Sequence, residues 1–90
     1  MVQVVWTRGA ATELRAIRAY VAQFSPLAAQ RLAARLVSAA RGLEQSPDRG
    51  RPISRGRREL VIIPPYLIRY ANLGDRIVIL EIRHAAREPD

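Results

Sequence analysis

The spacing of apolar residues changes midway along this 90-residue chain, from a helical period to a strand period. Up to about residue 45, apolar side chains recur every three or four positions, which is typical of amphipathic helices. After residue 52 the period is two, which is typical of strands. A chain of this length supports one core of two packed layers. The pattern therefore predicts a single α+β domain over residues 1–90, with its helices and most of its strands in separate halves.

The first half predicts a strand followed by a helical hairpin. Val2–Trp6 is β-branched and aromatic, as in a strand, with Trp6 as a packing residue. Thr7 is a plausible cap for a helix from about Ala10 to Phe24, and Ser25-Pro26 suits the start of a second helix. Because the link is short, the two helices should run antiparallel. The predicted apolar stripes are Leu14, Ile17, Val21 and Phe24 in the first helix and Ala29, Leu32, Ala33, Leu36, Ala40 and Leu43 in the second.

The second half predicts three antiparallel strands after a basic connector rich in proline and glycine, residues 46–52. These strands are Leu60–Ile63, Tyr66–Ala71 and Arg76–Arg83. Asn72-Leu73-Gly74 suits a three-residue hairpin with Gly74 in the left-handed conformation, which pairs Ala71 with Asp75. The register across Pro64-Pro65 stays open.

That register assigns the side chains of the last two strands to two faces. The face toward the helices should hold Tyr66, Ile68, Tyr70, Val78, Leu80 and Ile82, with Ile68 opposite Val78 and Tyr66 opposite Leu80. The other face should hold Leu67, Arg69, Ile77, Ile79, Glu81 and Arg83. Half of this second face is apolar, so we expect something to cover it. A partner protein is one candidate, and a loop or the chain's own termini are the other.

Composition limits the chemistry. The 15 basic residues are all arginine and face 8 acids, which gives a net charge of +7 and predicts an anionic partner. Arginine suits bidentate capture of carboxylate or phosphate, although coding bias in a GC-rich genome also explains the absence of lysine. With no cysteine and one histidine, neither a disulfide nor a metal cluster is expected. The absence of a leader and of a long apolar run predicts a soluble, cytoplasmic protein.

Several short motifs occur in an order that resembles the ParE branch of the ParE/RelE superfamily, the toxic halves of bacterial toxin-antitoxin modules. The ordered set, and no single motif, carries the resemblance over nearly the whole chain. The motifs are the opening Val4-Val5-Trp6 strand, Ala10-x-x-Glu13-Leu14-x-x-Ile17-x-x-Tyr20, Pro47-x-x-Gly50-Arg51, Arg58-Glu59-Leu60, Tyr66-Leu67-Ile68-x-Tyr70 and Ile79-Leu80-x-Ile82-x-His84-x-x-Arg87.

The resemblance implies a fold and a partner. The first strand should lie beside the last, with the helical hairpin on one face of the sheet. A ParD-like antitoxin should fold an acidic, partly disordered segment across the toxin, neutralising basic residues and burying apolar ones. No cofactor is implied. The candidate surface for the antitoxin or the toxic target is Arg49, Arg51, Arg55, Arg57, Arg58, Leu67, Arg69, Ile77, Ile79, Arg83 and Arg87.

The superfamily includes both enzymes and binding inhibitors. RelE-like members cut messenger RNA on the ribosome, whereas characterised ParE-like members poison DNA gyrase. RNA cleavage through the 2′-hydroxyl needs a base, an acid and cations around the phosphate. The best set for that chemistry is His84, Glu59, Arg69 and Arg83.

Two departures argue against the ribonuclease. Leu67 stands where ribonuclease members commonly carry an arginine, and no aromatic residue follows Tyr70 to stack on a base. His84 has the parity of the core face, which favours a structural role with a hydrogen bond to a backbone group. Glu59 lies beside Arg57 and Arg58, as an ion-pair partner would. The sequence therefore favours a non-catalytic toxin that binds gyrase.

A ribosome-dependent endoribonuclease remains the alternative. A plain nucleic-acid module is a third hypothesis, and it is weaker because the basic residues lack interleaved exposed aromatics.

Overall fold

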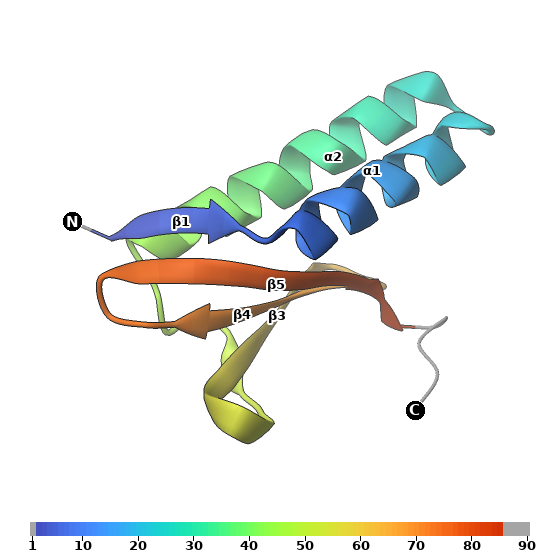
Figure 1. Ribbon diagram of the computed structural model, residues 1–90. Coiled ribbons are helices and arrows are strands. Elements are labelled where there is room, and N and C mark those ends of the chain that lie inside the picture. The colour runs from blue at the N-terminus through green and yellow to red at the C-terminus, as the bar shows by residue number, and fades with distance from the viewer. Residues whose placement is uncertain (1, 86–90) are drawn as a thin grey trace.

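The computed structural model describes residues 2–85 as a helical hairpin packed on one face of a five-stranded sheet (Figure 1). The sheet order is β1-β5-β4-β3-β2; β1 is parallel to β5 and the other pairs are antiparallel. The α+β prediction and the place of the first strand beside the last are confirmed. The elements are β1 (Gln3–Trp6), α1 (Arg8–Ala22), α2 (Pro26–Arg41), η1 (Gly42–Glu44), β2 (Arg51–Pro52), η2 (Ser54–Gly56), β3 (Arg57–Ile63), β4 (Tyr66–Asn72) and β5 (Arg76–His84).

Both predicted helix caps are confirmed. The Thr7 hydroxyl accepts from Ala10 N at 3.0 Å, and the Ser25 hydroxyl accepts from Ala28 N at 3.1 Å. Each bond satisfies one of the amide groups that a helix leaves unpaired at its start. However, α1 ends at Ala22, two residues before the predicted end. Phe24 therefore lies beyond the helix and is 74% exposed, so its place in the apolar stripe was wrong.

Leucines and alanines of the hairpin form one core with the strands. Leu36 and Leu43 are fully buried with Tyr70 and with isoleucines of β4 and β5. Trp6 packs against this core and is half-buried, as predicted. Neither helix in the described part of the chain has the length and apolar character needed to span a bilayer.

The register between β4 and β5 differs from the predicted one. Ile68 lies opposite Ile82 and not Val78, in part because the turn is centred further along the chain: Leu73 N donates to Arg76 O at 2.9 Å, which leaves Gly74 and Asp75 between the bonded residues. Gly74 does adopt the left-handed conformation, with φ of 91°. The register also shifts beside Leu80, since Arg69 pairs with Glu81 while Tyr70 pairs with Ile79. A β-bulge of this kind reverses the inward-outward alternation of the bulged strand.

Four β5 residues between the turn and the bulge lie on the faces opposite to the predicted ones, because the turn pairs Ile79 with the core residue Tyr70. Ile77 and Ile79 are 0% exposed in the core under the helices, whereas Val78 and Leu80 are half-buried outside that core. Their predicted faces were therefore wrong. Beyond the bulge the prediction is confirmed, because Ile82 is in the core and the charged Glu81 and Arg83 pair with each other outside it.

The connector is more ordered than the sequence suggested. The hydroxyl of the buried Tyr70 donates to Pro47 O at 2.8 Å and accepts from Gly50 N at 2.9 Å. The short strand β2 then pairs with β3 at Glu59 and Arg58, so β3 begins three residues before the predicted Leu60. The connector thus belongs to the sheet.

Gly50→Ala is expected to destabilise the fold by about 1–3 kcal/mol, because a well-packed site must shift to admit an extra carbon. A Cβ at Gly50 would lie 2.8 Å from Tyr70 Cε1 and 3.0 Å from the backbone oxygen of Glu59. Gly9→Ala is the matched control. It meets nothing within 4 Å in the first turn of α1, so the unfolding midpoint in urea should stay or rise. Equal unfolding midpoints for the two variants would contradict the close packing of Gly50 against Tyr70 and Glu59.

Candidate functional site

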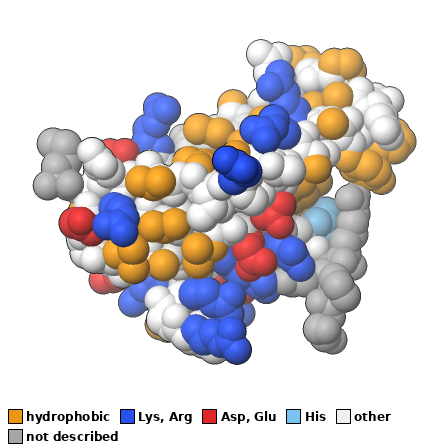
Figure 2. Space-filling view, in the orientation of Figure 1, with side chains coloured by type: hydrophobic (Ala, Val, Ile, Leu, Met, Phe, Trp, Pro, Cys, Tyr) orange, Lys and Arg blue, Asp and Glu red, His pale blue; other side chains and the backbone are white. Residues whose placement is uncertain are grey.

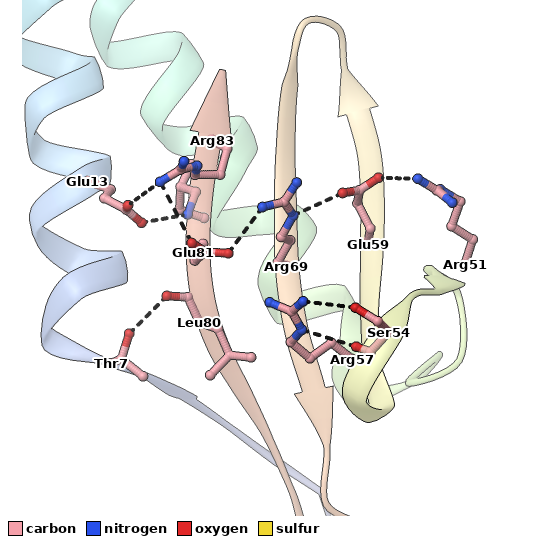
Figure 3. A network of polar contacts seen from close by, with 11 residues as sticks. Thr7, Glu13, Arg51, Ser54, Arg57, Glu59, Arg69, Leu80, Glu81 and Arg83 are labelled. Atoms are coloured by element: carbon pink, nitrogen blue, oxygen red, sulfur yellow. Dashed lines mark hydrogen bonds and ion pairs between the residues drawn. The ribbon is translucent and has the colours of Figure 1, made fainter. Parts of the chain in front are cut away.

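A row of alternating acids and arginines crosses the sheet face opposite the helices (Figure 3). We call this row the charge ladder. Each acid in it contacts at least one arginine, and the contacts run from α1 across β5, β4 and β3 to β2. The contacts are Glu13–Arg83 at 3.6 Å, Arg83–Glu81 at 3.7 Å, Glu81–Arg69 at 3.3 Å, Arg69–Glu59 at 3.0 Å and Glu59–Arg51 at 2.7 Å. The ladder therefore neutralises three arginines of the predicted binding surface within the chain itself.

Glu59 is the most enclosed member of the ladder, with 8% of its side chain exposed. Burial opposes its ionised form, but hydrogen bonds from Arg69 and Arg51 and their positive charge outweigh burial and lower the pKa of the Glu59 carboxyl. Both carboxylate oxygens are engaged, Oε2 by Arg69 and Oε1 by Arg51. Glu59 is thus an ion-paired anion, as predicted, but its partners are Arg51 and Arg69 and not the adjacent Arg57 and Arg58. It is a poor proton acceptor at neutral pH.

Glu13 links the ladder to the helical hairpin. Strand β1 covers the edge of β5 only as far as Ile79, and the edge beyond it is capped by side chains. Thr7 donates its hydroxyl to Leu80 O at 3.4 Å, and Glu13 Oε1 accepts from Ile82 N at 2.9 Å (Figure 3). The sequence analysis did not predict this role. Glu13 is the one acid in the first helix, and that could have marked it as a partner for an arginine or a backbone amide.

The five arginines between residues 49 and 58, which belong to the predicted binding surface, form separate groups in the structure. Arg51 belongs to the ladder, and Arg57 donates to the backbone oxygen and the hydroxyl of Ser54. Arg58 is directed to the connector, where it donates to Gly50 O at 2.7 Å and lies 3.4 Å from Asp48. Arg49 and Arg55 are exposed, and no carboxylate of the described residues pairs with either.

Three apolar candidates are not available for binding. Ile77 and Ile79 are core residues, since the turn register aligns them with the helix-facing side of β4, and Leu67 is only 5% exposed. The apolar side chain offered by β3 is Val61, opposite Leu67 and 53% exposed. Arg87 lies outside the described residues. All three predicted apolar contacts are therefore buried within the chain itself.

The four ribonuclease candidates do not converge. Glu59, Arg69 and Arg83 share the ladder face, which was predicted for Arg69 and Arg83 but not for Glu59. His84 follows Ile82 at the spacing that returns a strand to the same face, and its ring packs edge-to-face on Tyr66 with centroids 5.0 Å apart. Tyr66 itself packs against the core under the helices. The imidazole thus belongs to the opposite side of the sheet from Glu59.

The expected backbone hydrogen bond of His84 is missing at one ring nitrogen. Nδ1 is buried, and the described residues give it no hydrogen-bond partner. No three His, Cys, Asp or Glu side chains among residues 2–85 are grouped so that they could hold a metal ion. The site is therefore defined by arginine and carboxylate groups.

The chain is similar to known toxins over nearly its whole length. Residues 4–89 match the family model described as the ParE toxin of the type II toxin-antitoxin system parDE. "Toxin RelE2" of Caulobacter vibrioides is 55% identical over 87 residues, which cover 97% of this chain and 99% of that protein. "Putative toxin Y4kP" of Sinorhizobium fredii is 36% identical over 88 residues, which cover 96% of this chain and 91% of that one.

A solved structure has the same fold. A chain of the "Chromosomal ParDE TA system from P. aeruginosa" superposes with a TM-score of 0.83 and 31% identity, over 93% of this chain and 96% of that chain. Fold, charge and these matches define a toxin component of the type II toxin-antitoxin class. Within that class, the chain belongs to the ParE toxin family.

Proposed function

We propose that this protein inhibits growth by binding DNA gyrase and that a ParD-like antitoxin holds it inactive in the cytoplasm. One observation carries the proposal against an enzymatic reading: Glu59 is fixed between Arg51 and Arg69, on the other side of the sheet from His84. Acid-base catalysis needs two proton-transfer groups within reach of one substrate. The described residues offer the cations for phosphate binding without that pair, which supports binding as the mode of action.

The charge of the chain supports the antitoxin partner. A net charge of +7 on 90 residues attracts an acidic segment over long range and speeds its association. Exposed arginines such as Arg49 and Arg55 are available for such contacts. The family is named for modules in which toxin and antitoxin occur together, so the neighbouring gene is the place to seek the partner.

The toxin is expected to inhibit DNA supercoiling by purified gyrase and to leave gyrase-linked DNA breaks. Inhibition should reach its maximum at a toxin concentration comparable to that of gyrase, because a binding inhibitor does not turn over. Addition of the antitoxin from the neighbouring gene should restore supercoiling. Unimpaired supercoiling at a large excess of folded toxin would contradict gyrase as the target.

A ribosome-dependent endoribonuclease is the second candidate. It is favoured by the name of the 55% identical relative, Toxin RelE2. The described residues also leave Nδ1 of His84 without a hydrogen bond, so the predicted structural bond does not account for this atom. In this case the message in a translating reaction would be cut, and His84→Gln would abolish cutting while gyrase stayed active.

A further inference from the structure

Positive charge that the chain does not neutralise lies on helix α2 and on the connector. Residues 14–43 contain five arginines and no acid. Figure 2 shows arginine side chains along the hairpin, and mixed acidic and basic ones below it over the sheet. Among the described residues, no carboxylate pairs with Arg31 or Arg35 of α2, or with Arg49 of the connector. These three exposed arginines are therefore available to an anionic partner.

Arg35 and Arg49 border one groove, of about 270 Å³, between α2 and strand β3. Ser38 of α2 also lines it, and Ala39 and Ile62 complete its lining. The three polar residues are exposed, whereas Ala39 is buried and Ile62 is half-buried. The groove thus presents to solvent two guanidinium groups and a hydroxyl, all of which can donate hydrogen bonds.

Contacts beside Arg49 hold the connector in place and leave the Arg49 side chain unpaired. The next residue, Gly50, donates its backbone N–H to the Tyr70 hydroxyl at 2.9 Å. The preceding carboxylate, of Asp48, is engaged elsewhere, since it lies 3.4 Å from Nε of Arg58. Because the connector is already ordered, it loses less conformational entropy when a partner binds.

A further arginine of α2 extends this surface. Arg31 precedes Arg35 by four residues, so the two side chains are neighbours on one face of the helix. They also border a common groove of about 290 Å³. We call Arg31, Arg35 and Arg49, with the hydroxyl of Ser38, the basic row. It follows α2 and crosses to the connector.

The chemistry of the basic row suits a phosphate backbone. Phosphate contacts in protein–DNA complexes are made by arginine, lysine and hydroxyl side chains. The core of a protein interface is apolar and aromatic, whereas the exposed residues that line the groove at Arg49 are all polar. None of the described residues lining that groove is aromatic, so stacking of the bases of a single strand is not favoured either. A duplex, whose phosphates lie on the outside, fits best.

We propose that the basic row binds the phosphate backbone of a DNA duplex without reading its sequence. Arg35 and Arg49 contact one phosphate from two sides, and Arg31 contacts a neighbouring one. Since the proposed target, gyrase, acts on duplex DNA, the bound toxin then contacts the enzyme and its DNA together. This last step, and the choice of DNA, rest on the proposed function.

Fluorescence anisotropy with a short labelled DNA duplex, at several salt concentrations, tests the basic row. Each arginine–phosphate contact contributes about 0.9 to the slope of log affinity against log salt. Arg35→Gln and Arg49→Gln should each reduce that slope by about 1 and weaken binding at least about threefold at about 0.1 M salt. Arg8→Gln is the matched control, because Arg8 is exposed and follows β1 at the opposite edge of the sheet. It should change neither quantity.

Equal affinities and equal slopes for the wild-type toxin and both variants would overturn the basic row, as would a wild-type toxin that leaves the duplex unbound at low salt. If polyglutamate or an RNA duplex binds more tightly than DNA and shows the same losses, the surface takes another polyanion and the proposal is wrong. Circular dichroism and urea unfolding establish that each variant folds.

A supercoiling reaction separates this proposal from the proposed function. If the wild-type toxin binds the duplex through the basic row but leaves gyrase active, gyrase is overturned as the target while the row stands. If the wild-type toxin inhibits gyrase and the combined Arg35→Gln and Arg49→Gln variant inhibits it at the same concentration, the contact with DNA on gyrase is overturned while gyrase stands.

Discussion

Ile79→Ala is expected to lower the free energy of unfolding by about 2–5 kcal/mol, the range for a large buried aliphatic side chain truncated in a core. The neighbouring Leu80→Ala should lower the free energy of unfolding by only about 1 kcal/mol, because Leu80 is half-buried and lies outside the core under the helices. Urea unfolding followed by circular dichroism measures both differences at neutral pH.

This pair of variants tests the register of β5 directly. A regular hairpin with Gly74 as the third loop residue would put Leu80 in the core and Ile79 outside it. The order of the two costs would then be reversed. A larger loss for Leu80→Ala than for Ile79→Ala would contradict the bulge, and with it the removal of Ile77 and Ile79 from the binding surface.

Glu59→Ala is expected to destabilise the protein by about 2–3 kcal/mol, because the charge-assisted bond to Arg69 is lost in a partly buried site. Arg69 keeps Glu81 as a partner, and Arg51 is 69% exposed, so the cost stays below that of a fully buried pair left uncompensated. Glu44→Ala is the matched control, since Glu44 is exposed and makes no ion pair with the described residues. Equal unfolding midpoints for both variants would contradict the ladder.

The lowered pKa of Glu59 sets the pH dependence of this contribution. A carboxyl group whose pKa is lower in the folded chain stabilises the fold above its ordinary value of 4.5, and that contribution disappears as the pH falls through the folded value. The wild-type protein should therefore lose stability below about pH 4.5. Glu59→Gln should lose less over the same range.

Local signals in the sequence predicted the elements of this fold well. Thr7 and Ser25-Pro26 marked the helix starts because capping depends on a few adjacent residues. The period of two located β4 and β5, because the alternation of apolar and polar residues is also a local property of the sequence. The short strand β2 was missed, because two residues are too few to show a period. Its position also depends on a contact distant in sequence, since the preceding Gly50 donates to the hydroxyl of Tyr70, 20 residues away.

The candidate site was harder to predict, because it depends on register and on contacts distant in sequence. The position of the turn and the bulge beside Leu80 leave no clear local signal, yet together they decide which β5 residues face the helices. The pairing of Arg69 with Glu59 and Glu81 depends on the alignment of three strands, so the sequence analysis did not predict it. The link from Glu13 to Ile82 spans 69 positions and had no counterpart in the sequence reasoning.

Paired and unpaired charges lie on different parts of this small domain. Acids are concentrated where arginines meet on the sheet, and residues 14–43 have none. The ladder stabilises the strands, while the unneutralised arginines remain available to partners. The described charges of the sheet face are thus largely paired within the chain, whereas those of the hairpin have no carboxylate partner among the described residues.

The central proposal is that this toxin acts by binding and that residues 2–85 form no catalytic centre. Primer extension on a message in a translating reaction, with toxin at a small fraction of the ribosome concentration, tests it most directly. The message should remain intact, with the wild-type protein and with His84→Gln alike. New message ends that accumulate with the wild-type toxin and vanish with His84→Gln would contradict the claim.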